Sequence, residues 1–120
     1  MPPRQLLFRI QDILDALEAI RAYTEGMEFA DFVADRRTVD AVIRNLAIIG
    51  EAASHVPDEV CADHSDIPWT DMRSMRNFVV HEYFGISDAI LWDTVTRNLP
   101  SLHEPLQRIL ESKGRLSDEL

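Results

Sequence analysis

Residues 35–57, DRRTVDAVIRNLAIIGEAASHVP, decide the fold of this chain. Their apolar side chains recur at spacings of three and four residues, which places them on one stripe of an α-helix at about 100° per residue. That stripe consists of Val39, Val42, Ile43, Leu46, Ile49 and Ala53. Asp35 or Thr38 can cap the start of the helix, and Pro57 requires the helix to end before it. We therefore predict a long amphipathic helix whose apolar stripe belongs to the core.

One residue conflicts with this helical pattern. Gly50 lies in the interior of the predicted helix, where glycine costs about 1 kcal/mol relative to alanine. A glycine at such a position is explained when another segment comes too close for a side chain. We therefore expect a close contact on the face of the helix that carries Gly50.

A second amphipathic segment stands at the start of the chain. We predict a helix from roughly Arg4 to Thr24, ended by Gly26. Its core stripe is formed by Ile10, Ile13, Leu14, Leu17 and Ile20. A third long helix is predicted to begin at Pro68 and to reach Tyr83 or Phe84, with a stop at Gly85.

The remaining segments carry helix signals rather than the alternation of strands. In chain order we predict a turn of helix or a loop over 27–34, a short helix within 57–64, a helix over 89–98 capped by Ser87 and Asp88, a break at Pro100, and a last helix from a Ser101–Glu104 capping box to about Ser112, with a frayed tail beyond it. The fold class is therefore all-α, a bundle of about four main helices in a single domain over residues 1–120.

Composition limits the classes of function. The formal net charge of −9 argues against a broad basic surface for nucleic acid, so a polyanion would have to be bound locally. Cys61 is the only cysteine and has no disulfide partner within the chain, which suits a reducing cytoplasm. The first residues lack the apolar run of a signal peptide, and no run is long enough to cross a bilayer, so we expect a cytoplasmic protein without membrane contact.

Polar residues cluster in the run RNFVVHEY at residues 76–83. On a continuous helix Arg73, Arg76, Asn77, His81 and Tyr83 would share an arc of about 160°. Guanidinium groups bind phosphate in bidentate fashion, and histidine exchanges protons near neutral pH. Because RNA supplies its own 2′-hydroxyl nucleophile, such a pair fits RNA scission without a metal or another cofactor.

The spacing alone leaves a plainer interpretation open. His81 could be a core or interface histidine, Arg76 an ion-pair partner and Tyr83 a buried ring, because an arginine followed five residues later by a histidine is common by chance. A metal site is not predicted, since the four histidines have no i, i+4 pairing and no neighbouring set of ligands.

The sequence as a whole resembles the HepT-like proteins of the HEPN superfamily. The resemblance extends from Ile13 to Leu102 and is carried by several motifs in combination. These are the Phe29–Phe32 stretch, Asp40–Leu46 (DAVIRNL), Ile49–Ala52 (IGEA), Ile67-Pro68-Trp69, the Arg76–Tyr83 run, Trp92 and Leu99-Pro100.

The resemblance implies a HEPN-type helical bundle that forms a homodimer or a higher even oligomer, and a metal-independent endoribonuclease that acts as the toxin of a toxin–antitoxin system. By motif position Arg76 and His81 would be catalytic, and Asn77 would support them. Tyr83 would be the site at which an MntA-like nucleotidyltransferase antitoxin attaches AMP and silences the toxin. The added charge would repel RNA phosphates.

Other arginines and one carboxylate are assigned more loosely. Arg44 and Glu51 are seven residues apart and share a helix face, so they either support the site or a dimer contact, or form a solvated ion-pair face. Arg36, Arg37 and Arg73 are predicted contacts for RNA, although exposed arginines usually serve only the surface.

Two further functions compete with the ribonuclease. The chain could be a non-catalytic helical module that binds a nucleotidyltransferase partner or a nucleotide, with Arg76, His81 and Tyr83 as a recognition patch. It could also be a purely structural dimer, in which changes at polar positions would alter stability alone. Detection of RNA cleavage would distinguish the ribonuclease from both of these alternatives.

Overall fold

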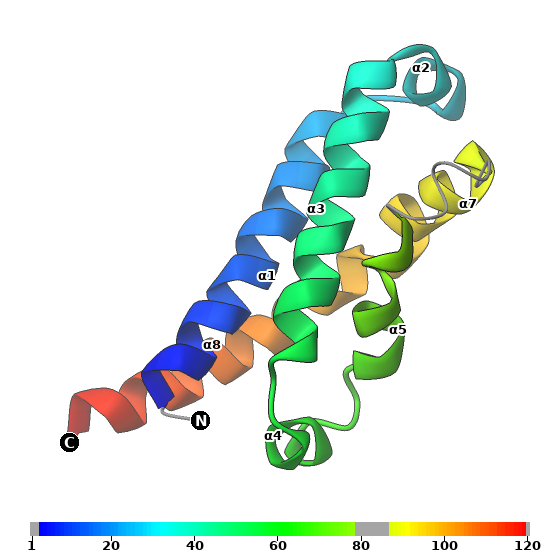
Figure 1. The fold of residues 1–120 in the computed structure, drawn as a ribbon. Helices are drawn as coiled ribbons and strands as arrows, with labels where there is room; N and C mark the ends of the chain where they lie inside the picture. The colour runs from blue at the N-terminus through cyan, green and yellow to red at the C-terminus, as the bar shows by residue number, and fades with distance from the viewer. Residues whose placement is uncertain (1–2, 79–86, 120) are drawn as a thin grey trace.

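The computed structural model describes residues 3–78 and 87–119, and throughout these residues there is no strand. The elements are α1 (Pro3–Thr24), α2 (Phe29–Ala34), α3 (Arg36–Ser54), α4 (Asp58–Asp63), α5 (Trp69–Ser74), α7 (Asp88–Asp93), the π-helix η1 (Thr94–Asn98), the 3₁₀-helix η2 (Pro100–Leu102) and α8 (His103–Glu119). Helices α1 and α3 run antiparallel side by side, α8 packs on α1, and α5 packs on α3 (Figure 1). The predicted all-α bundle is confirmed.

The predicted core stripes of the two longest helices are buried. On α3, the whole stripe is buried: Ile43 is 4% exposed and the other five residues are fully buried. The stripe of α1 faces them, and Leu106 and Ile109 of α8 close the core. Local spacing therefore identified the buried face of both helices, because a helix in a bundle has one apolar side to bury.

Helix starts and stops follow the polar signals at their ends. Asp35, rather than Thr38, is the N-cap of α3: its carboxylate accepts the backbone N–H of Thr38 at 3.2 Å and the Thr38 hydroxyl at 2.8 Å. The hydrogen bond from the Thr38 hydroxyl lowers the pKa of the Asp35 carboxyl most, and the bond from the Thr38 backbone N–H lowers it further. Gly26, with φ of +76°, follows α1 in the left-handed conformation that glycine tolerates.

The third long helix was predicted to be continuous from Pro68, and that prediction is wrong. Helix α5 ends at Ser74, and Met75 and Arg76 form a turn in which the Met75 N–H donates to the Met72 carbonyl, three residues back. Met72 and Met75 are both buried, and the Arg76 backbone nitrogen lies against Gly50 of α3, so contacts with the rest of the protein set the course of the chain where α5 ends. The angles computed for one straight helix therefore do not apply across Arg76.

In the C-terminal part, one predicted helix cap is confirmed and two other predictions differ from the structure. Ser87 caps α7 as expected, by accepting the Ala89 N–H at 3.1 Å. The capping box at Ser101 is wrong, because Ser101 lies inside η2 and its hydroxyl donates to the Asn98 carbonyl. Helix α8 continues to Glu119, beyond the predicted end at Ser112, and fraying of this tail stays a prediction.

Candidate functional site

Arg76 stands where α5 has ended, and its backbone rests directly on α3. A Cβ atom at Gly50 would lie 2.5 Å from the Arg76 backbone nitrogen and 3.0 Å from both the Arg73 carbonyl oxygen and the Arg76 Cβ. Such distances leave no room for any side chain at position 50. The expected close contact at Gly50 is therefore confirmed, and the segment that makes it begins the predicted catalytic motif.

The Arg76 side chain points to solvent beside one carboxylate. Its Nη1 lies 3.8 Å from Oε2 of Glu51, and both side chains are more than half exposed. Asn77 follows and is also exposed. A guanidinium held loosely in this way remains able to bind a phosphate group. His81 and Tyr83 lie outside the described residues, so their roles stay predictions.

Arg73, predicted as an RNA contact, makes several contacts within the protein. Its Nε donates to the Ala53 carbonyl at 3.3 Å, and its Nη2 donates to the Val56 carbonyl at 3.3 Å and to Sγ of Cys61 at 3.2 Å. The exposed Asp58 carboxylate lies 3.7 Å from the same nitrogen. Arg73 thus ties α5 to the C-terminal end of α3, where helix carbonyls lack partners within the helix.

The remaining predicted residues lie on α3. Arg37, Arg44 and Glu51 are spaced seven apart, and all three are exposed on one face of the helix. Arg36 instead pairs with Asp88 of α7 at 3.1 Å and donates to the Val33 carbonyl at 3.3 Å. Because of these two partners, Arg36 links the start of α3 to the segment that follows residues 79–86.

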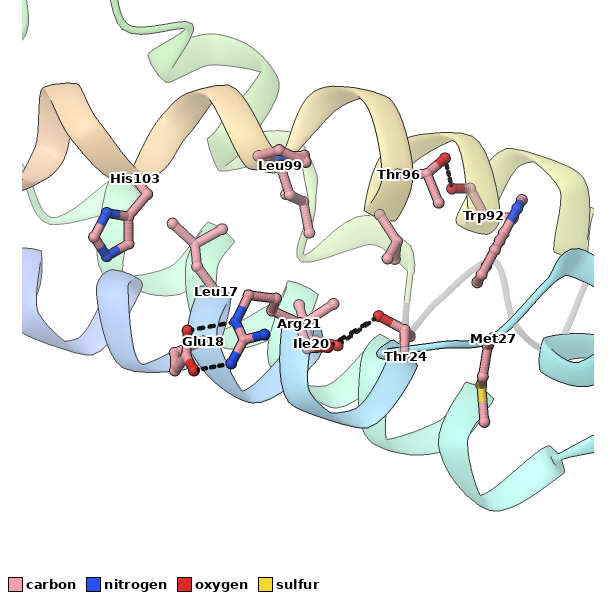
Figure 2. A pocket seen from close by; sticks show the side chains of 12 residues that line it. Leu17, Glu18, Ile20, Arg21, Thr24, Met27, Trp92, Thr96, Leu99 and His103 are labelled. Carbon is pink, nitrogen blue, oxygen red and sulfur yellow. Dashed lines mark hydrogen bonds and ion pairs between the residues drawn. The ribbon is translucent and has the colours of Figure 1, made fainter.

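A separate apolar pocket lies beside α1, and none of the predicted site residues lines it. Its volume is about 310 Å³, and it opens between α1 and the segment from α7 to α8 (Figure 2). Trp92 at its edge packs against Phe32, with ring centroids 5.1 Å apart.

Several polar groups at the rim of this pocket have hydrogen-bond partners within the protein. The Thr24 hydroxyl donates to the Ile20 carbonyl and the Thr96 hydroxyl donates to the Trp92 carbonyl (Figure 2). Arg21 is held by Glu18, and that hydrogen bond lowers the pKa of the Glu18 carboxyl. No local pattern in the sequence indicates this pocket, because its lining residues come from distant parts of the chain.

Residues 3–78 and 87–119 contain neither a cluster of metal ligands nor a membrane-spanning helix. No three histidine, cysteine or acidic side chains in these ranges lie close enough together to hold a metal ion. None of the helices described there has both the length and the apolar character needed to cross a membrane.

Comparison with known proteins gives consistent matches. Residues 13–109 match the family model described as Ribonuclease HepT-like. A protein of Thermococcus cleftensis named probable ribonuclease HepT is 40% identical over 100 residues, covering 83% of this chain and 91% of that protein. A candidate RNase of Caldanaerobacter subterraneus is 36% identical over 104 residues, covering 87% and 93%. One of Methanocaldococcus jannaschii is 33% identical over 111 residues, covering 92% of each chain. No solved structure matches.

Proposed function

The chain belongs to the ribonuclease HepT-like family, and from this premise we propose that it is an endoribonuclease whose catalytic groups are Arg76 and His81. The observation that carries the proposal is the position of Arg76. Its backbone is fixed on Gly50, while its guanidinium is more than half exposed beside Glu51. The first residue of the motif is therefore held by the fold and open to a phosphate.

The proposed reaction needs no metal ion. His81 takes the proton of the ribose 2′-hydroxyl, and the 2′-oxygen then attacks the adjacent phosphorus. The bond from phosphorus to the 5′-oxygen breaks, and a protonated imidazole gives that oxygen its proton. Arg76 stabilises the charge that builds on the phosphorane, and Asn77 supports the site as a hydrogen-bonding group. The products carry a 2′,3′-cyclic phosphate and a 5′-hydroxyl.

A homodimer is part of the proposal, and the open face of α3 supports it. Ile48, 38% exposed, lies on this face between Arg44 and Glu51. A two-fold axis near the middle of these residues would place Arg44 opposite Glu51 of the partner subunit, and the reverse. Each Glu51 would then link Arg44 of the other copy to its own Arg76, which would bring the two motifs to one cleft.

The dimer contact can be tested by exchanging charges. Arg44→Glu alone places two carboxylates opposite each other and should shift the protein toward monomer in analytical ultracentrifugation. The double variant Arg44→Glu, Glu51→Arg restores opposite charges across a two-fold axis and should recover the dimer. A double variant that remains monomeric would contradict this interface.

Regulation by an antitoxin is the remaining part of the proposal. The Tyr83 oxygen attacks the α-phosphorus of ATP on an MntA-like nucleotidyltransferase, and pyrophosphate leaves. The protein gains about 329 Da and negative charge, which would repel RNA from the site. Intact-mass analysis after coexpression with the neighbouring gene should give this gain on the wild type and not on Tyr83→Phe.

RNA cleavage by purified protein tests the central proposal. Wild type should cut a short RNA in the presence of EDTA, and Arg76→Ala and His81→Ala should each lose at least about a hundredfold in rate. Arg108→Ala and His103→Ala are the matched controls, since both residues are exposed on α8, and they should stay within about twofold of wild type. Undiminished cleavage by folded His81→Ala would contradict the mechanism. A wild type that binds the antitoxin but leaves RNA intact would favour the non-catalytic module.

A further inference from the structure

We infer that Gly50 and Arg73 are positioning residues for Arg76, and that Arg73 acts through the protein rather than on RNA. This inference rests on the proposed function of Arg76. Arg73 lies just before the end of α5 and donates to the last turn of α3, whereas Gly50 contacts Arg76 just after the end of α5. We refer to Gly50, Arg73 and the backbone of Arg76 as the α3–α5 clasp.

The first half of the clasp is the contact at Gly50. Its φ is that of an ordinary helix, since Gly26 is the one glycine with positive φ in the described residues. Glycine is therefore not required there for its backbone conformation. It is required because the Arg76 nitrogen would lie 2.5 Å from a Cβ atom, and backbone cannot give way as a flexible side chain can. The absence of a side chain at position 50 sets how close Arg76 comes to α3.

The second half is the Arg73 guanidinium. The Arg73 side chain is 32% exposed and donates to two carbonyls, that of Ala53 in the last turn of α3 and that of Val56 just after the helix. A planar cation with several donors suits this place, because the carbonyls at the C-terminal end of a helix carry partial negative charge. A guanidinium with these partners is poorly placed to bind a phosphate.

Both halves act on the same four residues. The Arg73 carbonyl oxygen also lies against Gly50, at 3.0 Å from the position of a Cβ atom, so residues 73–76 are held to α3 at both ends. Helix α5 stops at Ser74 and does not itself hold Arg76. The exposed pair with Glu51 is a weak restraint on the side chain. The α3–α5 clasp therefore determines the position of the Arg76 backbone, from which the guanidinium group extends.

A double-mutant cycle tests the Gly50 contact. Gly50→Ala should lower kcat for RNA cleavage at least about tenfold with KM within about twofold, because displacement of a catalytic group by about 1 Å is costly. In an Arg76→Ala background the same change should have almost no effect, since no guanidinium remains to be displaced. Asp40→Ala, an exposed change on α3 that also favours the helix, is the control and should stay within about twofold. Equal losses in both backgrounds would overturn the inference.

Arg73 is tested by the salt dependence of RNA binding. If it positions Arg76, Arg73→Gln and Arg73→Lys should both lower kcat at least about fivefold, because neither keeps the fork that reaches two carbonyls, while the slope of log affinity against log salt stays constant. If it contacts a phosphate, Arg73→Gln should reduce that slope by about one and Arg73→Lys should preserve it. The second pattern would overturn the inference.

A spectroscopic measurement separates this inference from the proposed function. The Nε–Hε resonance of Arg76, assigned by its loss in Arg76→Lys, should shift in Gly50→Ala and Arg73→Gln but not in Asp40→Ala. An unshifted resonance would overturn the clasp even if RNA is cleaved. If wild type leaves RNA intact, the proposed function fails, and a shift of this resonance would still support the clasp as the device that places Arg76.

Discussion

Replacing Glu51 with glutamine tests how strongly the carboxylate beside Arg76 contributes. The two charged groups lie 3.8 Å apart, and their side chains are 55% and 59% exposed, Arg76 being the less exposed. Glutamine keeps the size of the side chain and removes the charge. The carboxylate has two opposing effects, because it holds the guanidinium in place and also repels an approaching RNA phosphate.

The geometry limits both effects. At this distance two unit charges in water interact by about 1 kcal/mol, and exposed pairs in proteins reach that value at most. One such interaction corresponds to about a fivefold change in an equilibrium or a rate. We therefore expect Glu51→Gln to lower kcat by no more than about fivefold and to lower KM by a similar factor, so that kcat/KM changes little. Arg76→Ala, by contrast, removes charge stabilisation worth about a hundredfold or more.

Steady-state kinetics on a short end-labelled RNA at two salt concentrations would measure these effects. Both should diminish at the higher salt, because exposed charges are screened over about 8 Å at physiological ionic strength. Glu111→Gln, an exposed carboxylate on α8, is the control for removal of one negative charge. A loss of a hundredfold in Glu51→Gln would refute the reasoning, since it would make Glu51 part of the chemistry. A rise in KM would refute it as well.

Three further predictions concern the packing of Phe32, the ionisation of Asp35 and the reactivity of Cys61. Phe32→Ala should lower the free energy of unfolding by about 3–4 kcal/mol in urea denaturation, because Phe32 is fully buried against Trp92, whereas Phe29→Ala should cost less than about 1.5 kcal/mol. The pKa of Asp35 lies below its ordinary value of 3.8, so the ionised carboxylate stabilises the fold above pH 3.8, and this contribution is lost as the pH falls through the lowered pKa. The difference in melting temperature between wild type and Asp35→Ala should therefore be constant near neutral pH and shrink in acid. Burial raises the pKa of Cys61 despite the nearby guanidinium, so its reaction with a disulfide reagent at pH 8 should be slower than in the urea-unfolded chain, and equal rates would contradict that burial.

Much of the fold and one feature of the site could be predicted from spacing and end signals. The stripes of α1 and α3 determine which faces are buried, and Asp35 and Gly26 mark helix ends, because each signal acts within a few residues of the chain. Gly50 was informative in the same way, since a glycine in a helix that otherwise favours side chains indicates a contact from elsewhere. Its partner could not be named from the sequence.

The sequence by itself therefore determined the all-α class, the buried faces of the long helices, the family and the residues of the motif. Only the tertiary structure decided that α5 ends before Arg76, that Arg73 binds the end of α3, and that Arg76 rests on Gly50. Helical periodicity and caps depend on neighbours within about one turn. The position of Arg76 depends on contacts between residues 17 to 26 apart in the chain, and these form only when α3 and α5 pack together.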